Sequence, residues 1–128
     1  MYYINKQIEM VTFSEIERRV REELKKEGFG IITEINLREK FREKLSLEFR
    51  QYKILGACNT PFTYRALMAE DKIGTILPCN IIIQETGNSS IEVAAVDPVA
   101  SMERIRNEEL TGIASEIREM LARVIKRI

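Results

Sequence analysis

The sequence predicts an α+β fold, with five strands and two long helices, one early in the chain and one at its end. The alternation of strands and helices would by itself suggest a parallel α/β sheet. Two observations favour α+β instead. The two helices in the middle of the chain are too short to be full crossovers between parallel strands. A turn cluster at residues 86–90 also predicts a hairpin of two antiparallel strands.

Length, composition and charge define the class of protein. The 128 residues fall in the usual single-domain range, so one domain over residues 1–128 is expected. Twenty Lys and Arg balance twenty Asp and Glu, with both signs interleaved. Nucleic-acid binders need a basic face, so no nucleic-acid partner is expected. The sequence has no 18-residue apolar run and its first residues lack a signal-peptide profile, which predicts no membrane partner and a cytoplasmic location.

The first strand and the first helix follow one another at the N-terminus. Period-two spacing predicts a strand over residues 2–11, and Lys6 interrupts its apolar face. That face comprises Ile4, Ile8 and Met10. Thr12 begins the first helix in a capping box with Glu15, and Gly28 ends it. The helical residues expected to face the core are Phe13, Ile16, Val20 and Leu24.

Shorter elements fill the middle of the chain. Residues 29–35 read as the second strand and residues 52–58 as the third. Asn36 is a possible cap for a short helix after the second strand. The residues of that helix expected to turn inward are Leu37, Phe41 and Leu45. Thr60 is the expected cap of a further helix over residues 61–71, whose first residue is a proline.

The last third of the chain holds a hairpin and the second long helix. Residues 75–85 are the longest β-rich stretch, and residues 91–96 are expected to pair back with it. The stretch is apolar on both faces at Ile81, Ile82 and Ile83. Such a strand is typically covered on two sides, by helices or by a second subunit. Asp97 caps a short helical stretch, and Asn107 starts the last helix. Its apolar stripe comprises Leu110, Ile113, Ala114, Ile117, Leu121, Val124, Ile125 and Ile128.

Missing residue types and motifs exclude several chemistries. The chain has no histidine, which removes the commonest general base and every Ser-His-Asp or Cys-His arrangement. Cys58 and Cys79 form no Cys-x-x-Cys pair, so a four-thiolate zinc site is impossible. No glycine-rich phosphate loop occurs. We therefore assign no catalytic residue, metal or cofactor.

The two cysteines and one glycine are nevertheless candidates for a site. Cys58 lies just before a predicted helix N-terminus, which can lower a thiol pKa and make it reactive, but it also suits a small buried residue at a strand end. Cys79 shares a strand face with apolar residues, which favours a core position. Gly56 lies inside a strand, and this suggests a bulge or the close approach of another group.

Four blocks of sequence resemble domain-of-unknown-function family 302. They lie at residues 28–35, 52–61, 74–80 and 97–98 and, with the helices around them, cover nearly the whole chain. The resemblance implies a two-layer domain with a curved, mostly antiparallel sheet in the order β-α-β(4)-α, similar to the TATA-binding-protein-like class, and a homodimer. It implies no activity. Thr60 interrupts the Cys-Asn-Pro form that is usual in the family.

These observations predict a small homodimeric domain that binds a small or apolar ligand, or a protein partner, without catalysis. The site is expected where residues 58–61 meet residues 77–80, with Ile81 as a further wall. The candidate ligand-binding residues are Leu55, Gly56, Cys58, Asn59, Pro61, Leu77, Cys79 and Asn80. One alternative is a thiol-based redox, persulfide or soft-metal role at Cys58. The other is a purely structural or interaction domain.

Overall fold

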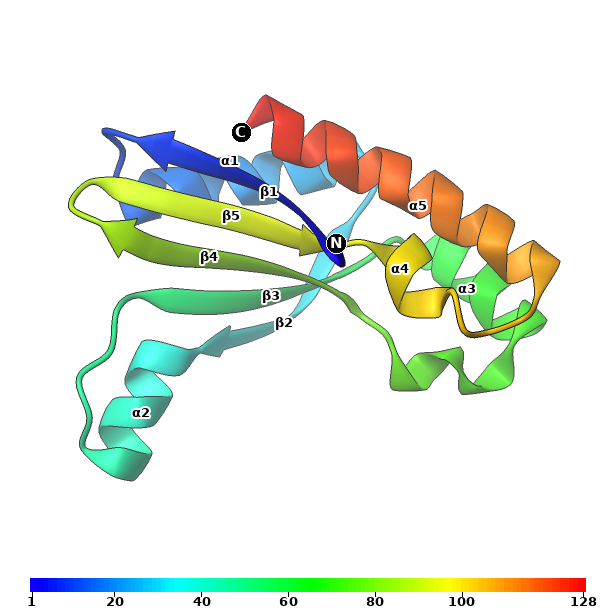
Figure 1. The fold of residues 1–128 in the computed structure, drawn as a ribbon, viewed down its shortest axis with the longest axis horizontal. Coiled ribbons are helices and arrows are strands. Elements are labelled where there is room, and N and C mark those ends of the chain that lie inside the picture. The colour runs from blue at the N-terminus through cyan, green and yellow to red at the C-terminus, as the bar shows by residue number, and fades with distance from the viewer.

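A five-stranded antiparallel sheet forms the centre of the molecule (Figure 1). The structure is a computed structural model that describes residues 1–128. The strand order is β1-β5-β4-β3-β2, and all neighbouring strands are antiparallel. In chain order the elements are β1 (Tyr3–Glu9), α1 (Phe13–Lys26), β2 (Gly30–Asn36), α2 (Leu37–Leu45), β3 (Tyr52–Cys58), α3 (Thr60–Ala69), the 3-10 helix η1 (Asp71–Thr75), β4 (Cys79–Gly87), β5 (Ser90–Val96), α4 (Pro98–Met102) and α5 (Glu108–Arg127). The predicted α+β fold is confirmed, with α2, α3 and α4 as short helices beside the two main ones.

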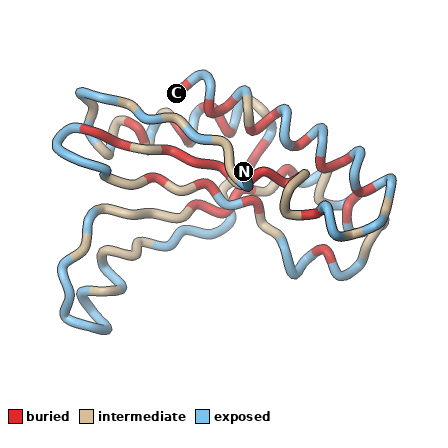
Figure 2. The backbone as a smooth tube through the Cα atoms, in the orientation of Figure 1, coloured by how far each residue is buried: buried red, intermediate tan, exposed pale blue.

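The long helices α1 and α5 cover the same face of the sheet (Figure 1). Their apolar stripes are buried, as the burial colours along α5 show (Figure 2). The strands meet them with alternate residues, so Ile81 and Ile83 are fully buried while Ile82 between them is only half-buried. The helices of this chain therefore cover one side of β4 only. None of the helices combines the length and the apolar character needed to cross a bilayer.

Caps and a glycine set the ends of α1 where the sequence predicts them. The Oγ1 atom of Thr12 accepts a hydrogen bond from the backbone N–H of Glu15 at 3.2 Å. This bond satisfies one of the amides that the first turn leaves without a helical partner. At the other end, Gly28 adopts a φ of 86°, a left-handed conformation that L side chains rarely take. The chain can therefore turn directly from α1 into β2.

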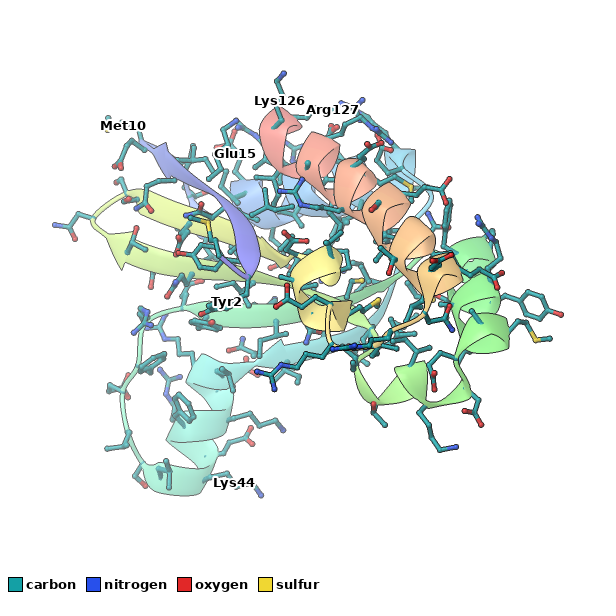
Figure 3. The ribbon with its side chains drawn as sticks, turned by 45° about the vertical axis from the view of Figure 1, so that its right-hand side comes forward. Tyr2, Met10, Glu15, Lys44, Lys126 and Arg127 are labelled. Carbon is teal, nitrogen blue, oxygen red and sulfur yellow. The ribbon has the colours of Figure 1, made fainter.

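Polar side chains join the C-terminal ends of the two long helices. The carboxylate of Glu27 accepts hydrogen bonds from Arg123 at 2.9 Å and from Arg127 at 2.7 Å. Figure 3 shows Arg127 at the end of α5, on the side where α1 lies. Lys6 interrupts the apolar face of β1 because its Nζ donates to the carbonyl of Ile128 at 2.6 Å. A cation at this position satisfies the last carbonyls of α5 and suits the negative end of the helix dipole.

A network of four charged residues connects α1, β2 and β3. Lys53 lies 2.9 Å from Glu17 and 3.0 Å from Glu34, and Arg21 bridges the same two carboxylates at 2.8 and 2.9 Å. Burial acts to raise the pKa of Glu17, but hydrogen bonds from Lys53 and Arg21 outweigh it, and the pKa is lowered. The hydrogen bond from Lys53 is the main cause of the lowered pKa of Glu34. Both carboxylates therefore favour their charged form in the folded chain.

Two expectations about the N-terminal half are wrong. Strand β1 ends at Glu9, and Met10 turns into solvent with a φ of 60° instead of sharing the apolar face with Ile4 and Ile8. Helix α2 has no buried residue, so its apolar positions do not point into the core. Phe41 packs instead against Phe49, with ring centroids 5.0 Å apart. The label on Lys44 marks how far α2 projects from the rest of the molecule (Figure 3).

The start of the longest strand also differs from the expectation. Strand β4 begins at Cys79 and not at Thr75, because the 3-10 helix η1 occupies Asp71–Thr75 and Pro78 directly precedes Cys79. A proline cannot donate to the sheet, so pairing begins only after it. The segment between η1 and β4 is thereby free to line a pocket at the end of the sheet.

Truncating Leu121 tests the assigned face of α5. Leu121 is fully buried, so Leu121→Ala should lower the free energy of unfolding by about 2–5 kcal/mol. Urea denaturation followed by circular dichroism measures the loss. Glu119, an exposed residue of the same helix, provides the matched control. Glu119→Ala should change the same free energy by less than about 0.5 kcal/mol. Equal losses in the two variants would contradict the assignment.

The charged network makes stability depend on pH. A carboxyl whose pKa is lower in the folded state contributes stability above its unfolded pKa, near 4.5, and this stability is lost as the pH falls through the folded pKa. We expect the urea midpoint to fall from about pH 5 downward, and to fall less steeply in a Glu17→Gln/Glu34→Gln variant. Glu48→Gln, which changes an exposed carboxylate outside the network, is the control. Identical pH profiles for all three proteins would refute this role.

Candidate functional site

Helix α3 and the 3-10 helix η1 lie at one end of the sheet, opposite the β4–β5 turn (Figure 1). Strand β3 leads through Asn59 directly into α3, and η1 leads back through Pro78 into β4. The ends of β3 and β4 are paired with each other, with Ala57 opposite Cys79. Two chain segments that are far apart in the sequence therefore meet under a single short helix.

A pocket of about 230 Å³ lies at this meeting point. Ten of its fourteen lining residues are hydrophobic. They come from the start of β2, the end of β3, the start of β4 and the segment before it, and from the helices α3, α4 and α5. The apolar walls include Phe29, Ala66, Leu67, Leu77 and Ile117. Such a pocket, with few polar groups, is typical of sites for small apolar molecules.

The two thiols of the chain both line the pocket, in different environments. Cys58 is half-buried, and its Sγ lies 3.1 Å from the Oγ1 of Thr63 in the first turn of α3. Cys79 is buried among apolar groups. Burial, and to a smaller extent the nearby Cys58 thiol, raises the pKa of Cys79 to about 11. Cys79 is therefore a neutral thiol near pH 7.

Asn59 positions the loop between β3 and α3. It occupies the N-cap position of α3, yet its side chain makes no capping hydrogen bond. The Nδ2 atom donates instead to the carbonyl of Glu27 at 3.1 Å and contacts the sulfur of Met120 at 3.7 Å. A Cβ on Gly28 would lie 3.3 Å from this Nδ2. The amide of Asn59 thus fixes the pocket wall to α1 and α5, and it leaves the first turn of α3 without a side-chain cap.

Gly56 is required by close packing on the other face of β3. A Cβ at this position would lie 2.7 Å from Cγ of Pro78 and would overlap Oγ1 of Thr33. The pairing of β2 with β3 shifts register between Ile31 and Thr33, beside Gly56. The close approach predicted from the sequence is confirmed.

Four of the predicted site residues line the pocket together, namely Cys58, Asn59, Leu77 and Cys79. The others do not. Leu55 and Ile81 pair directly with one another and lie fully buried beneath the long helices. Gly56 and Asn80 also pair, but they fall on the opposite face because side chains alternate along a strand. Pro61 is the second residue of α3 and stays outside the lining.

Several pocket residues were not predicted. Met102 comes from α4 and Ile117 from α5, and both are far from the cysteines in sequence. No local pattern indicates that these helices fold back over the end of the sheet. Thr63 was accessible to prediction, because a residue in the first turn of α3 lies close to a cysteine just before that helix.

A second hollow, of about 400 Å³, lies on the uncovered face of the sheet. Tyr2, Tyr3 and Tyr52 contribute to its lining, together with Asn80. Its carboxylate, Glu92, accepts hydrogen bonds from the amide groups of Asn5 and Gln84 at 2.9 and 2.7 Å. The carboxylate of this hollow is therefore hydrogen-bonded within the chain.

Comparisons with known proteins place the fold in a family. The chain resembles a solved crystal structure, that of an uncharacterized conserved DUF302 protein from Bacillus stearothermophilus, with a TM-score of 0.90 and 27% identity over 99% of this chain and 98% of the other. A comparison with curated proteins gave no match. The model of the family described as Domain of unknown function DUF302 matches residues 4–128. With nearly its whole length matched, the chain belongs to the DUF302 family.

Proposed function

We propose that this protein is a non-catalytic binding domain that holds a small apolar ligand in the pocket between the ends of β3 and β4 and helix α3. The observation that carries the proposal is the pocket itself, about 230 Å³ with mostly hydrophobic walls. An engineered apolar cavity of about 150 Å³ is large enough to bind benzene. The volume here therefore suits a compact molecule somewhat larger than a single aromatic ring.

Exposed residues at the mouth of the pocket also support the binding of an apolar ligand. Ile32 and Leu67 line the pocket while remaining 60% and 40% exposed. Helix α3 forms one wall with Ala66 as its only buried residue. An element with so few buried contacts opens at lower free-energy cost than the core around it. A ligand can therefore enter past α3 without disrupting the packing of α1 and α5.

Titration with benzene tests the proposed ligand class. Benzene should shift methyl NMR signals of Ala66, Leu77 and Ile117 saturably, because these residues line the pocket. Ala66→Phe should abolish the shifts by filling the volume. The matched control places the same ring on the exposed side of α3, so Met68→Phe should leave them unchanged. Uniform, non-saturating shifts across the wild-type protein would contradict the proposal.

We further propose that the protein is a homodimer through the uncovered face of its sheet. Ile82 lies on this face, half-buried and without a covering helix. The family resemblance also implies a dimer. A symmetric two-fold pair is the commonest solution for a self-associating chain. Both cysteines are free thiols, which suits the proposed cytoplasmic location.

Sedimentation velocity at micromolar concentration tests the dimer. We expect the mass of two chains for the wild type and of one chain for Ile82→Glu, because a carboxylate at the centre of an apolar contact is costly to bury. Ile76→Glu, which changes an exposed isoleucine outside the strands, should remain dimeric. A wild-type protein that sediments only as one chain would reject this interface.

A further inference from the structure

Three sulfur-containing residues from three separate elements line the same pocket. Cys58 comes from the end of β3, Cys79 from the start of β4 and Met102 from the end of α4. Cys79 lies opposite Ala57, the residue directly before Cys58. Two cysteines on neighbouring strands and one methionine thus contribute to the lining of a single space of about 230 Å³.

The other residues that line the pocket provide almost no oxygen or nitrogen ligand for a metal ion. No histidine exists in the chain, and Asn59 and Thr63 are the polar side chains of the pocket besides the thiols. Thiolates and thioethers select soft metal ions such as Cu(I), whereas carboxylates and carbonyls select hard ones. Structural zinc almost always takes four ligands, and no group of three or more His, Cys, Asp and Glu side chains occurs here. The donor set therefore discriminates in favour of Cu(I).

We propose that this pocket is also a binding site for Cu(I), held by the thiolates of Cys58 and Cys79 and the thioether of Met102. Binding breaks two S–H bonds, forms two copper–thiolate bonds and one copper–thioether bond, and releases two protons to solvent. Copper stays monovalent and no electron is transferred. The site uses the same pocket as the proposed function, but it does not require that an apolar ligand binds there.

The complex carries one net negative charge, and the fold supplies a compensating field. Cys58 lies two residues before Thr60, the first residue of α3. The cysteine is therefore close in the chain to the N-terminus of that ten-residue helix, which is the positive end of its dipole. Because the side chain of Asn59 bonds to Glu27 and not to the first turn, the N-terminal amides of α3 lack a side-chain acceptor. A neighbouring thiolate is the anion that this helix end can stabilise.

Anaerobic titration of the reduced, full-length protein tests the site. Cu(I) is supplied as its acetonitrile complex in competition with a chromophoric Cu(I) chelator. We expect one Cu(I) per chain, release of two protons and an X-ray absorption spectrum that shows only sulfur neighbours. Cys58→Ser should weaken binding by more than about a hundredfold, and Met102→Leu by about tenfold. Met68→Leu removes an exposed methionine of α3 and should change nothing.

Unchanged affinity in both Cys58→Ser and Cys79→Ser would overturn the proposal, as would nitrogen or oxygen neighbours in the wild-type spectrum. The spectrum needs no variant, so it decides the question even if Cys79→Ser fails to fold. The benzene titration of metal-free protein separates the two proposals. Benzene binding without Cu(I) binding rejects the copper site alone, and Cu(I) binding without benzene binding rejects the apolar ligand alone.

Discussion

The packing of α1 and α5 on one face of the sheet determines what the rest of the chain can do. These helices bury alternate residues of β4, such as Ile81 and Ile83, and leave the residues between them uncovered. They also leave one end of the sheet to be closed by α3, whose only buried residue is Ala66. The molecule therefore has a firmly packed layer, an uncovered face, and an apolar pocket under a helix with a single buried residue.

Polar residues in unexpected positions hold this arrangement together. Lys6 lies on an apolar face of β1 and donates a hydrogen bond to the last carbonyl after α5. Lys53 of β3 forms ion pairs with two carboxylates, one on α1 and one on β2. The side chain of Asn59 does not cap α3 but donates a hydrogen bond to the carbonyl of Glu27 at the end of α1. Each of these groups stabilises the junction of elements that are distant in sequence. The pocket is shaped by these junctions and not by any single loop.

Local signals explain why much of the fold could be predicted. The cap at Thr12, the turn at Gly28 and the stripe of α5 depend on residues a few positions apart. Part of the site could also be predicted from the sequence, because Cys58 ends β3 and Cys79 begins β4, the strand that pairs with it. Leu55 and Ile81 lie outside the pocket because they are further along their strands, beneath α1 and α5, whereas the pleat turns Asn80 to the opposite face of the sheet. The approach of Met102 and Ile117 depends on tertiary packing, for which the local sequence carries no pattern.

The proposed function requires that the space beneath α3 is an apolar binding pocket. A crystal pressurised with xenon tests it most directly, because xenon enters apolar cavities and scatters anomalously. We predict an anomalous peak between Ala66, Leu77 and Ile117, in contact with the residues that line the pocket. Ordered water in that space with no xenon peak would show that the pocket is a hydrated surface feature and would contradict the claim.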